Sequence, residues 1–242
     1  MTPGRVKCCK GDKPLPAKAE DKPQDIFEVW SVTKEELSQA ILENGSLRGM
    51  VFGYVAEIKI RNFLRDSGLI SELVKDDDHD RKKKGDLRLQ YRGHEFRLES
   101  KSLQTARNVK AADGSWKGFS QVDASDRRTV VLPDGSSLAT TCLVFGEFDV
   151  LSVNCFTFEN QWRCAFAKNK DLPASTFGKY TPEQREHLIA TTVAVTWPPS
   201  GIFADDLFGL LDEIIEDRAA NKEAAEAVTI QQPGHPAVMV EE

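Results

Sequence analysis

Two acidic residues and a lysine in the middle of the chain have types and a spacing that could perform chemistry. Asp86 begins a stretch in which polar and apolar residues alternate, 86–91, and Glu99 and Lys101 end a second such stretch, 94–101. Period-two alternation on both sides of a glycine-containing turn predicts an antiparallel hairpin. Such pairing brings the start of the first strand to the end of the second. We therefore expect Asp86, Glu99 and Lys101 to converge at one open end of the hairpin.

These three side chains suit a reaction assisted by magnesium. Mg²⁺ prefers oxygen ligands and usually takes one or two protein carboxylates, which Asp86 and Glu99 would supply. The bound ion would lower the pKa of a coordinated water. Lys101 lies two residues after Glu99, so both share one strand face. Its ammonium would orient or help deprotonate the water, or offset charge on a phosphate. The pattern indicates phosphodiester hydrolysis.

The same residues carry a resemblance to a known family. Gly85-Asp86, a gap of twelve residues, and then Glu99-Ser100-Lys101 resembles the PD-(D/E)xK nuclease superfamily, which includes many type II restriction endonucleases. The departure is Gly85, which stands where the family has proline. With the preceding helix, the resemblance covers about residues 50–101.

The resemblance implies further features of the site. It implies a restriction endonuclease-like core in which an additional acid on the preceding helix, Glu57, joins the catalytic residues. It also implies that the Ser100 carbonyl completes the metal shell of Asp86 and Glu99. The expected cofactor is Mg²⁺, for which Mn²⁺ would substitute.

The tripeptide alone is weak evidence, because an acid two residues before a lysine occurs four times. The four pairs are Glu20–Lys22, Glu57–Lys59, Asp80–Lys82 and Glu99–Lys101. Only the last ends a predicted strand that has a second acid at the start of its partner. The alternative is an exposed hairpin whose charged residues line a solvated face.

Charge is distributed unevenly along the chain. The whole sequence has a net charge of −6, yet residues 81–110 contain ten Lys/Arg against three acidic residues, a local net charge of +7. Such a patch can contact a phosphate backbone, although it is also typical of a solvated hairpin. The residues predicted to bind DNA are Lys82, Lys83, Lys84, Arg88, Arg107, Lys110, Gln121, Arg127 and Arg128.

Hydrophobic periodicity predicts the elements around the hairpin. A capping box at Thr33–Glu36 predicts the start of one helix. The spacing of apolar residues over 46–67 predicts a second helix, which carries Glu57 and is expected to pack beside the hairpin. Residues 103–127 are expected to form a long ordered loop. Later strands are expected at 128–132, 138–145, 148–156, 161–167 and 190–197, and later helices from 181 and over 204–217. The order predicts an α/β fold, bordering on α+β, with a central mixed sheet flanked by helices.

Composition predicts three parts: a flexible N-terminal segment over 1–24, a folded domain over 25–218 and a flexible tail over 219–242. No apolar run approaches the roughly 18 residues that cross a bilayer, and residues 1–25 lack the apolar stretch of a secretion signal. The five cysteines lack the spacing of a zinc site. We therefore expect a cytoplasmic protein.

These features together predict a DNA endonuclease of the restriction or phage-defence type. The expected partner is double-stranded DNA, bound by a homodimer whose symmetry would match a two-fold cut site. A cognate methyltransferase or a helicase is a further expected partner. The alternatives are a structure-specific nuclease for junctions or repair, a DNA-binding subunit that needs a partner protein, and an acidic interaction module without a role on nucleic acid.

Overall fold

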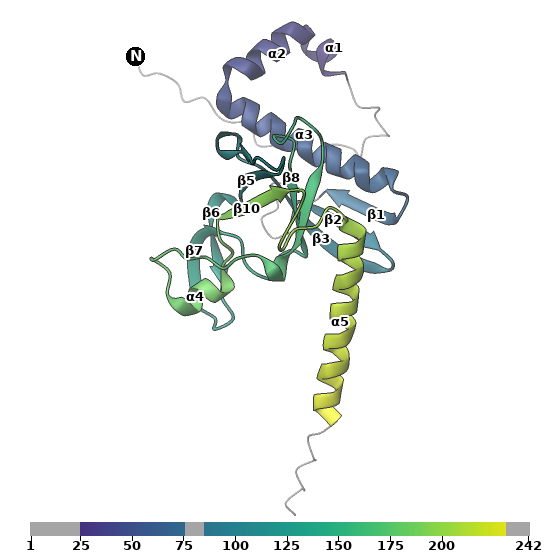
Figure 1. Cartoon of the computed structure of the whole chain (residues 1–242), viewed down its shortest axis with the longest axis vertical. Coiled ribbons are helices and arrows are strands. Elements are labelled where there is room, and N and C mark those ends of the chain that lie inside the picture. Colours follow the sequence, from purple (N-terminus) through teal and green to yellow (C-terminus); the bar gives the residue numbers. More distant parts are fainter. Residues whose placement is uncertain (1–24, 76–84, 231–242) are drawn as a thin grey trace, which may run out of the picture. The chain divides into compact units, whose positions relative to one another are not determined.

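The computed structural model describes residues 25–75 and 85–230, and the side chains of these residues up to 226. The chain divides into two compact units, Met1–Val51 and Phe52–Glu242. Figure 1 shows the elements in chain order. The first unit contains α1 (Ile26–Trp30), α2 (Lys34–Glu43) and the first turns of α3 (Gly45–Asp66).

The predicted capping box begins α2. The Thr33 hydroxyl accepts a hydrogen bond from the Glu36 amide at 3.1 Å, and the Glu36 carboxylate accepts one from the Thr33 amide at 2.8 Å. This exchange satisfies two amides that have no partner inside the helix. Among the residues of α1 and α2, none is buried.

A five-stranded mixed sheet lies at the centre of the second unit. Its order is β1-β2-β3-β8-β9, and β3 and β8 run parallel while the other neighbours run antiparallel. The strands are β1 (Ile70–Lys75), β2 (Leu87–Tyr91), β3 (His94–Ser102), β8 (Val150–Asn154) and β9 (Cys164–Lys168). With helices beside it, this sheet confirms the predicted α/β class.

The predicted hairpin is formed by β2 and β3. Leu87 pairs with Leu98 and Tyr91 pairs with His94. Arg92 and Gly93 form the turn with φ of 49° and 78°. Two consecutive positive φ values match the twist of the flanking strands, which explains the short connection.

Two helices cover one face of the sheet. α3 and α5 (Leu207–Ile230) pack against the inward residues of β2 and β3. This confirms that the helix carrying Glu57 lies beside the hairpin. The buried members of this cluster are Ile60, Leu64, Leu87, Leu89, Tyr91, Phe96, Leu98, Val150, Phe166, Leu207, Leu210, Leu211 and Ile214.

The second apolar cluster includes Leu151 and Val153 of β8, whose side chains alternate with that of Val150 in the helix-facing cluster. It also contains Val195 of β10 (Thr192–Trp197). β10 belongs to a three-stranded sheet with β5 (Trp116–Gln121) and β4 (Val109–Lys110). The sheet is thus buried on both faces along β8.

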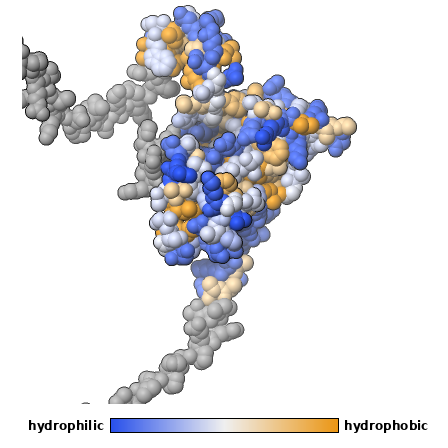
Figure 2. Space-filling model, turned by 90° about the vertical axis from the view of Figure 1, so that its left-hand side faces the viewer, coloured by the Kyte–Doolittle hydropathy of each residue, from blue (hydrophilic) through white to orange (hydrophobic). Residues whose placement is uncertain are grey.

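The remaining elements are short. A two-stranded sheet pairs β6 (Asp123–Val131) with β7 (Ser137–Cys142). The other elements are α4 (Pro182–His187) and the 3₁₀ turns η1 (Thr105–Arg107) and η2 (Asn169–Asp171). No helix in the described parts of the chain is long and apolar enough to cross a membrane. On the face drawn in Figure 2, apolar patches lie among hydrophilic residues.

The largest differences from the prediction lie in residues 103–127, in β1 and at the end of α5. Residues 103–127, expected as a loop, contain β4, β5 and the start of β6, because β5 pairs with β10 about 70 residues later. β1 was not predicted, and its pairing with β2 carries an irregularity between Ile70 and Glu72 that breaks simple alternation. α5 continues to Ile230, beyond the residue 218 at which we expected the folded domain to end. Ala and Glu are good helix formers, which explains this extension.

Truncation of a buried α3 residue tests the packing of this helix on the sheet. Leu64 is fully buried, so Leu64→Ala is expected to lower the free energy of unfolding by about 2–5 kcal/mol. Leu69 is 53% exposed, and Leu69→Ala should change it by less than about 0.5 kcal/mol. Urea denaturation measures both. Equal effects would mean that α3 does not pack as described.

Candidate functional site

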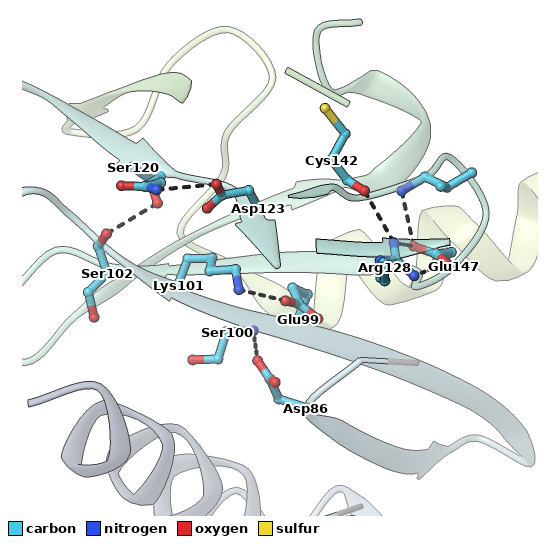
Figure 3. Close-up of polar contacts among 12 residues, drawn as sticks. Asp86, Glu99, Ser100, Lys101, Ser102, Ser120, Asp123, Arg128, Cys142 and Glu147 are labelled. Atoms are coloured by element: carbon cyan, nitrogen blue, oxygen red, sulfur yellow. Dashed lines mark hydrogen bonds and ion pairs between the residues drawn. The ribbon is translucent and has the colours of Figure 1, made fainter. Parts of the chain in front are cut away.

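The hairpin brings Asp86 to the end of β3. The Asp86 amide donates to the Leu98 carbonyl at 2.9 Å, and its carboxylate accepts from the Ser100 amide at 2.7 Å (Figure 3). The second bond fixes the carboxylate beside the Glu99-Ser100-Lys101 segment. Because β1, β3 and β8 run in the same direction, their carboxyl ends meet at this end of the sheet.

Glu99 and Lys101 form an ion pair within the site. The Lys101 ammonium lies 2.8 Å from the Glu99 carboxylate, and the two side chains are only 21% and 9% exposed. Desolvation lowers the pKa of Lys101, but the Glu99 and Asp86 carboxylates together raise it above its ordinary value. Lys101 therefore carries its positive charge throughout the neutral range.

A third carboxylate, Asp123, belongs to the same electrostatic environment. It lies at the start of β6 and accepts a hydrogen bond from the Gln121 side chain at 3.2 Å. Figure 3 shows it on the same side of β3 as Lys101, whose pKa it helps to raise. The site therefore combines one ammonium with three carboxylates.

The backbone of Ser100 adds a carbonyl oxygen beside Asp86. In a strand, the N–H and C=O of one residue point to the same side. Because the Ser100 amide donates to the Asp86 carboxylate, its carbonyl also points toward the β2 side of β3. A carbonyl and a carboxylate thus share one side of the strand, and Glu99 is the adjacent residue.

This donor set fits a magnesium ion. Carboxylate and carbonyl oxygens are the ligands that Mg²⁺ prefers, and it usually keeps several waters. Asp86, Glu99 and the Ser100 carbonyl match that requirement. Within residues 25–75 and 85–230 there is no group of three or more His, Cys, Asp and Glu side chains arranged to hold a metal by themselves.

Glu57 lies on α3 near the same end of the sheet. Its carboxylate is 2.6 Å from the ammonium of Lys75, the last residue of β1. Lys75 pairs with Leu87, the neighbour of Asp86, and its ammonium also lies 4.9 Å from the Tyr54 ring centroid. The helix therefore places Glu57 beside the strand ends, where it is engaged by Lys75.

The predicted DNA-binding residues are dispersed. Arg88 faces Glu95 at 3.5 Å, and Lys110 is paired with Glu159 at 3.0 Å. Arg107 is exposed on η1, and Gln121 is held by Asp123 as described above. Lys82, Lys83 and Lys84 lie outside the described residues. Binding of DNA by these side chains stays a prediction.

Two adjacent arginines on β6 have different surroundings. Arg127 is exposed, whereas the Arg128 guanidinium is bonded to the Glu147 carboxylate, with one contact of 2.6 Å, and to the Cys142 carbonyl at 3.3 Å. Both members of the Arg128–Glu147 pair are less than 20% exposed. Arg128 thus ties β6 to the end of β7 (Figure 3).

Sequence reasoning missed two residues near the site, Lys75 and Asp123. Lys75 precedes a run of charge and ends a strand that lacks clean alternation. Asp123 follows Gln121 by two residues, and nothing local in the sequence shows that β6 begins beside β3. Both placements depend on pairings between distant segments.

Comparisons with known proteins do not assign this chain to a family. No protein-family model matches the chain, and no curated protein matches it significantly. Among solved structures, a bacterial homing endonuclease matches with a TM-score of 0.32 and 15% sequence identity. The match covers 56% of this chain and 85% of that one. A likeness this weak says nothing about chemistry, which rests on the site itself.

Single substitutions of two adjacent arginines distinguish a residue with a structural role from an exposed residue. Arg128→Ala removes the guanidinium that neutralises the largely buried Glu147 carboxylate and is expected to lower the free energy of unfolding by about 3 kcal/mol. Arg127→Ala, its exposed neighbour, should change it by less than about 0.5 kcal/mol. Urea denaturation of both variants measures the difference. A stable Arg128→Ala protein would contradict the structural role.

The exposed carboxylate of Glu159 gives a pH prediction. Hydrogen bonds from Lys110 at 3.0 Å and from Arg163 at 3.1 Å lower its pKa from 4.5 to about 2. A lowered pKa means that its contribution to stability is complete above about pH 4.5 and is lost as the pH falls toward 2. Glu159→Gln should therefore reduce the urea midpoint at pH 7 more than at about pH 3. An equal reduction at both values would show that its charge is not involved.

Proposed function

We propose that this protein is a magnesium-dependent endonuclease that hydrolyses DNA phosphodiester bonds at Asp86, Glu99 and Lys101. The observation that carries the proposal is the fixed arrangement at the end of β3. There, the Asp86 carboxylate is bonded to the Ser100 amide, and Lys101 is paired with the neighbouring Glu99. Two metal-ligating carboxylates and one retained positive charge are the groups that this reaction needs.

Each residue has a distinct role in the proposed reaction. Asp86, Glu99 and the Ser100 carbonyl would hold Mg²⁺, and Mn²⁺ would substitute. When bound, the ion stabilises negative charge on the phosphate and makes coordinated water more acidic. Because the Ser100 amide holds the Asp86 carboxylate, that ligand is oriented before the metal arrives. Such preorganisation favours a defined binding geometry.

Lys101 would act beside the attacking water, as its ammonium lies 2.8 Å from the Glu99 carboxylate. An ammonium offers three donors and no acceptor. Lys101 would therefore orient the attacking water and offset the negative charge that develops on the phosphate. Glu57 would adjust the charge balance next to Asp86 through Lys75.

The biological setting is a further part of the proposal. The motif at residues 85–101 supports a restriction or phage-defence enzyme that acts on double-stranded DNA. Cleavage of both strands would be performed by a homodimer, and a methyltransferase or a helicase is the expected partner class. The competing hypothesis is a structure-specific nuclease. A pocket near the site that is lined by two tryptophans favours this hypothesis.

Conservative substitutions test the site. Glu99→Gln and Lys101→Met are each expected to reduce cleavage of plasmid DNA in Mg²⁺ by a factor of about 100 or more, the effect of losing one group that stabilises the transition state. Glu95→Gln is the matched control, because Glu95 lies on the same strand but is 41% exposed. Cleavage of labelled DNA is measured over time, and EDTA should abolish it.

The outcomes separate the alternatives. Loss of cleavage in both site variants, with Glu95→Gln active and all three proteins folded by circular dichroism, supports the proposed site. Undiminished cleavage in both site variants would place the reaction elsewhere. A folded wild-type protein that binds DNA in a salt-dependent manner but cuts none would indicate a subunit that needs a partner.

A further inference from the structure

A pocket of about 290 Å³ lies in the second unit, between α3 and the strand ends. Lys59 and Ile60 of α3 form one wall, and Asn154 ends β8 at another. Trp162, Arg163, Trp197 and the acidic residue Asp205 also line the pocket. We call these residues the aromatic pocket.

Trp162 is held in place by other rings yet remains accessible. Its ring centroid lies 5.5 Å from that of Phe52, with an angle of 26° between the planes, and 4.4 Å from that of Phe156. Even so, 39% of the residue is exposed. A large ring that is fixed before binding loses little entropy when a second ring contacts it.

Cationic groups lie over both tryptophans. The Lys59 ammonium is 5.6 Å from the Trp162 centroid, and the Arg163 guanidinium is 4.2 Å from that of Trp197. Arg163 is oriented by hydrogen bonds to the Phe158 carbonyl at 3.3 Å and to Glu159 at 3.1 Å. The pocket therefore offers flat π surfaces and positive charge together.

This combination matches a nucleotide. Unstacked bases bind by stacking on aromatic rings or on arginine planes, and the attached phosphate is attracted to lysine and arginine. A purely apolar ligand would make no use of the Lys59 ammonium, and a simple anion would make no use of the rings.

The pocket lies at the same end of the sheet as the proposed nuclease site. Asn154 pairs with Ser102, the residue after Lys101, and its side-chain amide lies 3.4 Å from the Ser102 hydroxyl. A strand rises about 3.3 Å per residue and neighbouring strands are about 4.8 Å apart, so the α-carbons of Ser100 and Asn154 are about 8 Å apart. Glu99 and Lys101 face away from α3, whereas the pocket lies on the α3 side, so a DNA strand that crosses this end of the sheet could reach both.

We propose that the aromatic pocket binds a single unstacked nucleobase of the DNA strand whose phosphate occupies the site at Asp86, Glu99 and Lys101. The inference rests on the proposed function, because the neighbouring phosphate is assigned by it. Unstacking costs least where DNA is already single-stranded or damaged. The pocket therefore favours the structure-specific nuclease over the restriction enzyme, and the enzyme should prefer single-stranded or locally opened DNA to intact duplex.

Binding of a short fluorescent single-stranded oligonucleotide tests the pocket. Glu99→Gln serves as the background, so that the DNA stays intact, and anisotropy gives the Kd. Adding Trp162→Ala should weaken binding about 5- to 150-fold, the effect of losing one stacked base. Trp162→Phe should restore most of the affinity, because a ring remains. Trp30→Ala is the control, since Trp30 is exposed on α1 and is not in the lining.

Abasic substitution identifies the bound base. In a series of oligonucleotides, each lacking the base at one position, one position should weaken binding to the Trp162-containing protein and have no effect on Trp162→Ala. The proposal is overturned if a folded Trp162→Ala protein binds as tightly as its parent, or if no single base matters.

Cleavage by the wild-type chain keeps the two proposals apart. Base-dependent binding without any metal-dependent cleavage would retain the pocket and remove the nuclease. Cleavage lost in Glu99→Gln, together with a Kd that Trp162→Ala leaves unchanged, would retain the nuclease and remove the pocket. Cleavage of duplex at the same rate as single-stranded DNA would contradict the inferred preference.

Discussion

The position of β3 at the centre of the five-stranded sheet is the constraint on which the site depends. It bonds to β2 on one side and to β8 on the other, so its register is fixed twice. Side chains alternate along a strand, and a slip of one residue would turn every one of them to the opposite face. Glu99 and Lys101 would then point toward the helices, and Asp86 would no longer meet the Ser100 amide.

The buried charges of the site are not expected to increase the free energy of unfolding. Glu99 and Lys101 are largely removed from water, and desolvation of an ion pair can cost more than the attraction returns. Apolar side chains at these positions would extend the neighbouring clusters. Retaining three carboxylates around one ammonium leaves an excess of negative charge, which a divalent cation would neutralise. The site is thus a local exception to the rules that shape the rest of the sheet.

The sequence predicted well those elements whose signals are local. Alternation on both sides of Arg92-Gly93 specified the hairpin, and the capping box at Thr33 specified the start of α2. Convergence of Asp86 with Glu99 and Lys101 followed directly from the hairpin. β5 and β10 pair across a long stretch of chain, and so the strands within 103–127 left no local signal. The same distance hid Asp123 from the site.

Side-chain identity alone also failed to distinguish surface arginines from structural ones. Arg127 and Arg128 are neighbours in the same charged segment, and only the fold shows that Arg128 meets Glu147, 19 residues later. Likewise, Lys110 looked like a residue for phosphate but is paired with Glu159 and lies over the Trp116 ring. The number of Lys and Arg residues in a segment therefore overestimates how many of them can bind a ligand.

The parallel pairing of β3 with β8 has a consequence for how the protein folds. Residues 103–149 separate the two strands, whereas β2 and β3 are joined by a two-residue turn. Closing a long loop costs more chain entropy, so the hairpin should form early and β8 should join late. Until then, β3 presents an open edge to other chains. The strand that carries Glu99 and Lys101 would then be exposed to aggregation during synthesis.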